Sequence, residues 1–385
     1  MQPIGSVILK ATAYCNLNCS YCYMFNLGDK SYLGRPKVMP KEVVRASAKA
    51  VAKYAKDQGI KSMPIVIHGG EPMLAGKDWL AFAVEEFRRE GGDEVQFGFA
   101  LQTNAVLISP SWIQLFHDLD VQVAVSMDGP AHVHDKYRVN HAGHGSHALV
   151  VKGLRMLMDS PYAEDVFGGV LCVIVPGADG LEIYRHFREL GVPRMDFLLP
   201  LEYNWHNTPP WFAKPGSTPI ADYLIPIFDD WWAEGNPDVY VRIFFQILQI
   251  AMGAKRHIDS LGGDPINLAV IESDGSLEPL DGLRACEDGL TQLGLNILRD
   301  PLDALYSRRL FRIAMSGQRG LCKTCKECEL RKVCGGGYLV NRYSRDNGFD
   351  NPSVLCADLY KLIDYVTDHA WAAVQDSRKA AISVV

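Results

Sequence analysis

This 385-residue chain lacks the features that mark several broad classes of protein. Its longest apolar stretch, residues 243–254, contains two Gln and is shorter than the roughly 20 residues that a membrane-spanning helix needs. No run of Lys and Arg is long enough for a nucleic-acid patch, and the formal net charge is −6. The first ten residues lack the basic segment and long apolar core of a secretory signal. We therefore predict a cytoplasmic protein with neither a membrane nor a nucleic acid as its partner.

Cysteine is absent from residues 173–285, and the ten cysteines gather elsewhere in the chain. Three lie before residue 23 and six lie between residues 286 and 356. In a chain without a secretory signal, this many cysteines indicates metal or redox chemistry rather than disulfides. Cys172 stands alone inside an apolar run, so we expect it to be a small buried side chain.

The first three cysteines share one short loop, with the spacing Cys15-x3-Cys19-x2-Cys22. A [4Fe–4S] cluster needs thiolate ligands, and three such ligands leave its fourth iron open to another molecule. An open iron is a reactive iron. A Cys-x2-Cys zinc or redox pair with one unrelated Cys is the alternative interpretation.

This loop resembles the signature of the radical S-adenosylmethionine (SAM) enzymes, and a second motif resembles theirs as well. His68-Gly69-Gly70-Glu71-Pro72 follows an expected strand, as the Gly-Gly-Glu-Pro motif does in that family. The resemblance implies that SAM chelates the open iron and is cleaved reductively to a 5′-deoxyadenosyl radical. It also implies that backbone groups and the Glu71 carboxylate hold the SAM amino group, with glycine allowing close approach. Taken alone, the Gly-Gly pair would be an ordinary turn.

Further polar residues at expected strand ends match the same family in the same order. The resemblance implies that the amides of Gln102 and Asn104 meet the SAM ribose or the substrate. It implies that Ser126 and Arg138 hold the SAM carboxylate, for which a guanidinium fork is suited. A polar cap at a strand end is the alternative for each. The residues assigned in this way to SAM are Tyr21, Gly69, Gly70, Glu71, Gln102, Asn104, Ser126, Asp128 and Arg138.

Short β-rich runs alternate with helical patterns between residues 6 and 199, which is typical of βα units and a parallel sheet. The expected strands are 7–11, 65–68, 96–101, 121–126, 169–175 and 195–199, and the expected helices are 41–57, 78–90, 110–119, 147–159 and 181–190. Six such units do not close an eight-stranded barrel. The resemblance therefore implies an α/β fold, the (β/α)6 partial TIM barrel of the radical SAM core. We expect this barrel over residues 1–215, a helical connector over 216–262 and a Cys-rich domain over 263–385.

The Cys-rich tail resembles the SPASM domain, which usually carries two auxiliary [4Fe–4S] clusters. A zinc ribbon would use two Cys pairs, whereas this tail has Cys-x2-Cys-x5-Cys and a distant fourth Cys. The resemblance assigns one auxiliary cluster to Cys325, Cys328, Cys334 and Cys356. A zinc-binding interaction module is the non-enzymatic alternative, although it leaves the N-terminal loop unexplained.

The usual ligands of the other auxiliary cluster are incomplete. Leu280 and Tyr338 stand where the family has cysteines. Cys286 and Cys322 are left over, and we expect them to anchor an atypical auxiliary site, since Fe–S ligands are thiolates. Structural thiols, or a part in catalysis, are the alternatives.

The function that these resemblances imply is the maturation of a peptide. Asp281 aligns with a carboxylate that acts as a general base in SPASM enzymes that oxidise peptide side chains. The alternative is that Asp281 and Gly282 simply form a turn. Residues 334–338 and 348–359 resemble those of maturases that install cyclophane crosslinks in ribosomally made peptides.

The implied reaction takes a hydrogen from a side-chain β-carbon of a precursor peptide and joins that carbon to an aromatic ring of the same peptide. An external electron donor of the flavodoxin or ferredoxin type is implied as a further partner. Oxidation of a sugar or nucleoside, and formylglycine-type oxidation of a protein side chain, remain as alternatives.

Overall fold

The computed structural model describes residues 2–254 and 259–382, which form two compact units. Unit 1 consists of Met1–Cys172 and Asn267–Met315, and unit 2 consists of Val173–Ile266 and Ser316–Val385. The two units interleave along the chain. They therefore differ from the three contiguous segments expected from the sequence, and that division stays a prediction.

Unit 1 is built on a sheet with the strand order β10-β9-β8-β1-β2-β3-β4-β5. Neighbouring strands from β8 to β5 are parallel, and β9 and β10 are added in antiparallel fashion. The strands are β1 (Ser6–Thr12), β2 (Ser62–Gly69), β3 (Gln96–Thr103), β4 (Val121–Ser126), β5 (Phe167–Val173), β8 (Leu268–Ile271), β9 (Ser276–Glu278) and β10 (Leu295–Asn296). The predicted α/β fold with a parallel sheet is confirmed.

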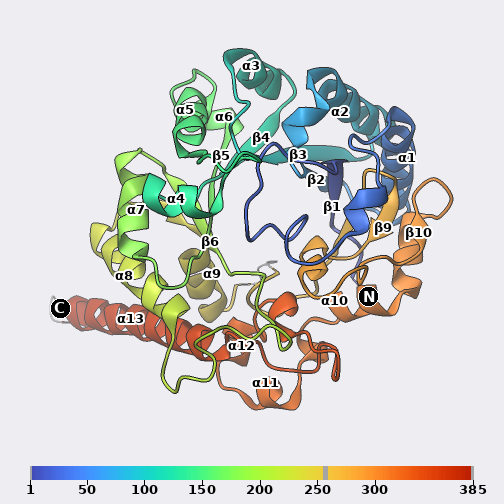
Figure 1. Ribbon diagram of the computed structural model, residues 1–385. Coiled ribbons are helices and arrows are strands. Elements are labelled where there is room, and N and C mark those ends of the chain that lie inside the picture. The colour runs from blue at the N-terminus through green and yellow to red at the C-terminus, as the bar shows by residue number, and fades with distance from the viewer. Residues whose placement is uncertain (1, 255–258, 383–385) are drawn as a thin grey trace. The chain divides into compact units, whose positions relative to one another are not determined.

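Amphipathic helices lie on the outer side of this sheet (Figure 1). The first of them buries Val44, Val51 and Ala55, which recur on one face at the helical period, and its bounds are those predicted. Cys172 on β5 is fully buried, as expected. The helices of unit 1 are α1 (Lys41–Asp57), α2 (Lys77–Gly91), α3 (Pro110–Asp118), α4 (Ala131–Tyr137), α5 (His147–Met158), α6 (Ala163–Val166) and α10 (Arg309–Ala314), with 3-10 helices η1 (Ser31–Gly34), η2 (Pro72–Ala75), η3 (Asp281–Ala285) and η4 (Leu302–Ser307).

The β8–β9 hairpin joins the N-terminal strands in one sheet, although the sequence placed it in a C-terminal domain. β8 pairs in parallel with β1, so that Val7 lies opposite Ala269. Asp274 and Gly275 form the turn between the two strands, with Gly275 at a φ of +84° that favours glycine. This pairing places the segment that follows the hairpin, including η3, near β1.

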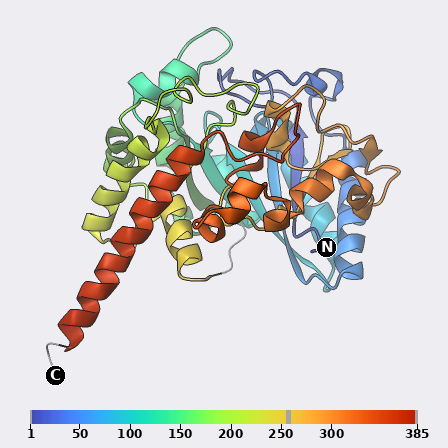
Figure 2. The same ribbon diagram turned by 90° about the horizontal axis from the view of Figure 1, so that it is seen from below.

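Unit 2 is mainly helical around two short parallel strands. The long helix α13 packs on α8 and α9, and its last turns extend past them (Figure 2). In the described part of the chain, no helix combines the length and apolar character needed to cross a membrane. The elements of unit 2 are β6 (Arg194–Leu198), β7 (Tyr240–Val241), α7 (Gly180–Glu189), α8 (Pro219–Glu234), α9 (Arg242–Ala251), α11 (Lys323–Glu327), α12 (Arg331–Cys334), α13 (Cys356–Ile382), η5 (Gly317–Gly320) and η6 (Leu339–Arg342).

Candidate functional site

The loop after β1 carries Cys15, Cys19 and Cys22, and backbone hydrogen bonds hold it in place. The Asn18 N–H donates to the carbonyl of Val139 at 2.7 Å, and the Cys22 N–H donates to that of Cys19 at 3.0 Å. The three thiols are half-buried, and burial raises the pKa of Cys15 to about 12 and that of Cys22 to about 11. Iron that binds here must therefore displace protons from the thiols. A thiolate set of this kind fits three irons of a [4Fe–4S] cluster.

Gly69 and Gly70 lie against the backbone that leads into this Cys loop. Gly69 has a φ of +140°, and a Cβ on it would lie 2.4 Å from the Thr12 carbonyl oxygen. A Cβ on Gly70 would lie 2.1 Å from the carbonyl oxygen of Tyr14. Both positions therefore require glycine because two backbone segments touch. The predicted contact of these glycines with SAM stays a prediction.

Glu71 ties the end of β2 to the end of β3. Its fully buried carboxylate accepts hydrogen bonds from the N–H groups of Met73 (3.0 Å) and Asn104 (2.8 Å) and from the hydroxyl of Thr103 (2.8 Å). Burial raises the pKa of Glu71 to about 7. The side-chain amide of Asn104 donates to Asn16 at 2.7 Å and so fixes the Cys loop. Contacts of Glu71 and Asn104 with SAM stay predictions.

Arg138 brings a buried positive charge beside the Cys loop. Tyr21 donates its hydroxyl proton to Asp128 and accepts a hydrogen bond from Arg138 at 2.9 Å. Among the described residues, the buried Nε of Arg138 has no hydrogen-bond partner. Burial raises the pKa of the Cys19 thiol, and the nearby Arg138 charge partly offsets that rise. A buried unmet donor on a guanidinium is a fitting partner for a carboxylate ligand, and the SAM carboxylate has this chemistry.

Asp281 begins η3 and is bound by side chains from the start of the chain. Its carboxylate accepts hydrogen bonds from the ammonium of Lys10 and from the hydroxyl of Tyr23, the second at 2.6 Å. Asp281 is 7% exposed and Lys10 is fully buried. Burial alone would raise the pKa of Asp281, but the charge of Lys10 and the hydrogen bonds from Lys10 and Tyr23 act together with the nearby His68 to hold the pKa below its usual value. The side-chain partners of Asp281 thus come from a distant part of the sequence, and its role as a general base stays a prediction.

A row of polar side chains continues from Lys10 across the carboxyl ends of β1 to β4. The Nζ of Lys10 lies 2.9 Å from Nδ1 of His68, whose Nε2 lies 3.1 Å from Oε1 of Gln102. Nε2 of Gln102 then donates to the Ser126 hydroxyl at 3.2 Å. Burial and the Lys10 charge lower the pKa of His68 to about 3, so its imidazole is neutral. Active sites in barrels of parallel strands lie at this end of the strands.

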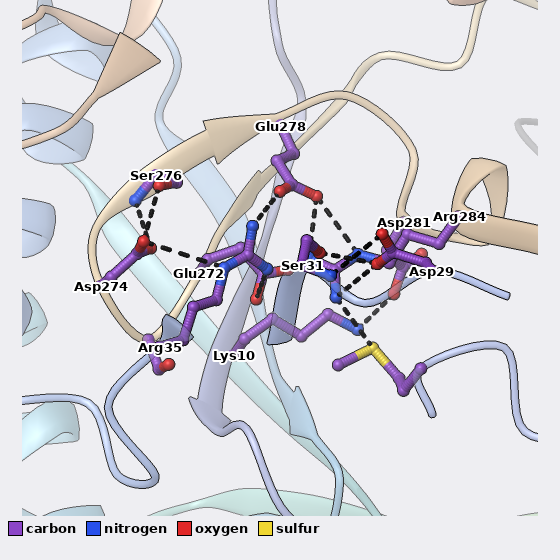
Figure 3. Close-up of polar contacts among 12 residues, drawn as sticks. Lys10, Asp29, Ser31, Arg35, Glu272, Asp274, Ser276, Glu278, Asp281 and Arg284 are labelled. Atoms are coloured by element: carbon purple, nitrogen blue, oxygen red, sulfur yellow. Dashed lines mark hydrogen bonds and ion pairs between the residues drawn. The ribbon is translucent and has the colours of Figure 1, made fainter. Parts of the chain in front are cut away.

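A buried network of charged side chains lies beside Asp281 (Figure 3). Arg284, which is fully buried, forms ion pairs with Glu272 at 2.7 Å and Glu278 at 3.0 Å. Arg35 binds the same two carboxylates. Because η3 carries both Asp281 and Arg284, this network fixes the 3-10 helix from which Asp281 projects.

The four predicted ligands of an auxiliary cluster lie together in unit 2. Cys325 lies in α11, Cys328 follows it, Cys334 ends α12 and Cys356 begins α13. A negative charge on one of these thiolates would raise the pKa of others in the set, which shows that the thiols lie near one another. Over residues 2–254 and 259–382, no three His, Cys, Asp or Glu side chains are arranged as around a single metal ion. A cube differs from a single ion because each thiolate binds its own iron, and the Cys set fits that chemistry.

The cysteines of the predicted atypical site lie in different units. Cys322 acts on the pKa of Cys325 and of Cys356, and it therefore lies near the four-cysteine set of unit 2. Cys286 is buried at the end of η3 in unit 1. Leu280 and Tyr338, which the sequence analysis aligned with cluster ligands, are both buried. The predicted site of Cys286 and Cys322 stays a prediction.

Lys10, Tyr23 and His68 were not assigned a role by the sequence analysis. One signal for Lys10 was available, because it is the only charged residue of the otherwise apolar strand β1. His68 similarly ends the apolar run of β2. Neither signal says which carboxylate the lysine would meet.

Comparisons with known proteins bear on this arrangement. Residues 9–190 match the family model of the Radical SAM superfamily. An uncharacterized protein from Synechocystis, sll1766, is 26% identical over 92% of this chain and 88% of its own length. A cysteine-type anaerobic sulfatase-maturating enzyme from Clostridium perfringens is 25% identical over 95% of this chain and 96% of its own.

Two solved structures share the fold. The structure of anSMEcpe with bound AdoMet and the Kp18Cys peptide has a TM-score of 0.81, with 22% identity over 96% of this chain and 99% of that one. SuiB from Streptococcus suis, bound to its precursor peptide SuiA, has a TM-score of 0.60, with 17% identity over 92% of this chain and 76% of that one. The segment matched to the superfamily contains the Cys loop, the Gly-Gly-Glu turn and Arg138.

Proposed function

We propose that this chain, which is a radical SAM enzyme using SAM and [4Fe–4S] clusters, crosslinks a side-chain β-carbon to an aromatic ring within a ribosomally made precursor peptide. The observation that carries the proposal is the buried Asp281 carboxylate, held by Lys10 on the strand that leads into the Cys loop. Peptide complexes of anSMEcpe and SuiB support a peptide as the substrate class.

A crosslink of this kind removes two hydrogen atoms from the peptide. SAM, bound beside the cluster that Cys15, Cys19 and Cys22 would hold, would supply on reductive cleavage a radical able to take one hydrogen atom from the β-carbon. Asp281 takes the second hydrogen as a proton from the ring carbon after the new C–C bond has formed. That proton is strongly acidic once one electron has also left the ring, because the ring is then a cation and loss of the proton restores its aromaticity. A weak base that is always ionised, as Asp281 is, therefore suffices.

The remaining electron needs a one-electron acceptor. Cys325, Cys328, Cys334 and Cys356 would hold a cluster of that chemistry, and a flavodoxin- or ferredoxin-type protein would donate the electron that SAM cleavage consumes. Arg138 and Ser126 would hold the SAM carboxylate. A reducing cytoplasm would keep the ten cysteines available as thiols, so we place the reaction there.

A second candidate is the oxidation of a Cys or Ser side chain to an aldehyde. The named sulfatase-maturating relative favours it, because the similarity extends over 95% of this chain. Leu280 and Tyr338, at positions where cluster ligands are expected, argue against it. Crosslinking is therefore the first candidate.

The test is an anaerobic reaction of the reconstituted enzyme with two kinds of peptide. One is a candidate precursor with aromatic residues, encoded beside the gene, and the other carries the Cys or Ser of a sulfatase-type site. Crosslinking predicts the loss of two hydrogen atoms from the first peptide, missing fragments between the joined residues in tandem mass spectrometry, and no reaction with a hydrazide. A hydrazide-reactive product from the second peptide would replace the crosslinking proposal with aldehyde formation. SAM cleavage that no peptide stimulates would favour a small-molecule substrate.

A further inference from the structure

We infer that Lys10, His68 and Gln102 are positioning residues that fix the direction in which the Ser126 hydroxyl donates its proton. They form one hydrogen-bonded row over four adjacent strands, with every bond donating toward Ser126. The row joins the Asp281 ion pair to the end of the site proposed to bind the SAM carboxylate. The inference rests on that proposed role of Ser126 and not on the identity of the peptide product.

The direction of the row follows from the lysine that begins it. An ammonium has three N–H donors and no acceptor. Among the described residues, the hydrogen-bond partners of the Lys10 ammonium are Asp281, Tyr23 (3.1 Å) and Nδ1 of His68 (2.9 Å). Nδ1 of His68 must therefore accept. The proton of the neutral ring must then lie on Nε2, which is the tautomer that donates to Gln102.

The same reasoning carries the direction through Gln102 to Ser126. Oε1 of Gln102 accepts from His68, so its NH2 group faces Ser126 and donates to the hydroxyl oxygen. The hydroxyl of Ser126 is thus an acceptor inside the row, and its own proton is left to point elsewhere. Within the described residues, no group accepts that proton.

Two donors without a protein acceptor among the described residues lie in the segments that end β4 and follow α4, namely the half-buried Ser126 hydroxyl and the buried Nε of Arg138. Both call for an anionic acceptor, and a carboxylate provides one. If the His68 tautomer were reversed, Gln102 would have to rotate, and Ser126 would donate into the row. The ligand would then lose one donor, although no residue that touches it had changed.

The test compares two substitutions of His68 in the cluster-loaded enzyme. His68→Gln keeps an acceptor for Lys10 and a donor for Gln102, whereas His68→Leu keeps neither. The Kd of SAM is measured by anaerobic equilibrium dialysis without reductant, so that no SAM is cleaved and no peptide is needed. Failure of the peptide proposal therefore cannot be mistaken for failure of this one.

We expect Ser126→Ala to raise the Kd of SAM about 10-fold or more, as expected for the loss of one hydrogen bond to a charged group. His68→Leu should raise it about 3- to 10-fold, and His68→Gln should stay within about 2-fold of the wild type. In the Ser126→Ala background, His68→Leu should add almost nothing, because both changes remove the same donor. Iron content and the far-ultraviolet circular dichroism spectrum of each variant show whether it is folded and loaded.

A second variant covers the case in which His68→Leu does not load its cluster. Gln102→Glu keeps the shape but can only accept, so Ser126 must turn its proton into the row. It should raise the Kd of SAM in the wild-type background by more than in the Ser126→Ala background, where only its added charge and the loss of its own amide contact with SAM act. Equal binding by His68→Leu and His68→Gln, or effects that multiply with Ser126→Ala, would overturn the inference.

Discussion

Replacing Asp281 by Asn tests the proposed base, but the structure shows that the substitution does two things. It removes the group that takes the proton, and it leaves the buried Lys10 ammonium without its counter-charge. Loss of general-base catalysis lowers a rate by about 10²- to 10⁴-fold. Loss of one partner of a buried ion pair costs about 3–5 kcal/mol of stability. The single variant therefore cannot separate a catalytic role from a structural one.

The double variant Lys10→Met/Asp281→Asn separates the two effects. Methionine removes the unpaired cation with little change in side-chain length, so the double variant should recover stability relative to Asp281→Asn alone. Its product yield should stay about 10²- to 10⁴-fold below the wild type, because the base is still missing. SAM cleavage should continue in both variants at saturating SAM, since the Cys loop is unchanged, although the loss of Lys10 frees the His68 tautomer and should raise the Kd of SAM in the double variant.

The assay measures 5′-deoxyadenosine and modified peptide in the same anaerobic reaction. The expected result is uncoupling, in which 5′-deoxyadenosine forms without product. A double variant that is well folded and gives the wild-type amount of product per SAM cleaved would remove Asp281 from the mechanism.

Three further predictions concern the clusters and Glu71. Replacing the three cysteines of the loop after β1 by Ala should abolish 5′-deoxyadenosine formation and leave iron at the tail, and SAM cleavage by that variant would refute the assignment of the loop. Iron analysis should give about 8 Fe per chain for two cubes, or up to about 12 if Cys286 and Cys322 anchor a third; a third cluster with four Cys ligands would refute the atypical site. The raised pKa of Glu71 means that the folded protein holds an extra proton between the usual Glu pKa of about 4.3 and about 7. Stability of the SAM-free protein should therefore fall as pH rises through this window, and Glu71→Gln should lose that dependence; parallel curves of thermal midpoint against pH would contradict it.

The regular elements of unit 1 and the Cys loop were predictable because their signals are local. Apolar residues alternate or recur with the helical period within each element, and the loop cysteines lie within eight residues of one another. The ion pair of Lys10 and Asp281 joins residues 271 positions apart, and it depends on the pairing of β8 with β1. No local pattern contains that pairing. The sequence analysis attributed the glycines at positions 69 and 70 to close contact with SAM. In the structure, close contact with the backbone of Thr12 and Tyr14 is by itself sufficient to require glycine at both positions.

Strand β1 has two neighbours that a ribosome would make at very different times. β2 ends at Gly69, whereas β8 does not begin until Leu268, about 200 residues later. At about 5–20 residues per second, the second edge of β1 stays unpaired for about 10–40 s of translation. An open strand edge is a template for pairing with other chains, and this one leads directly into the Cys loop. The nascent chain therefore holds the thiols of the Cys loop beside an unpaired strand edge until β8 emerges, and we expect it to be prone to aggregation during this interval.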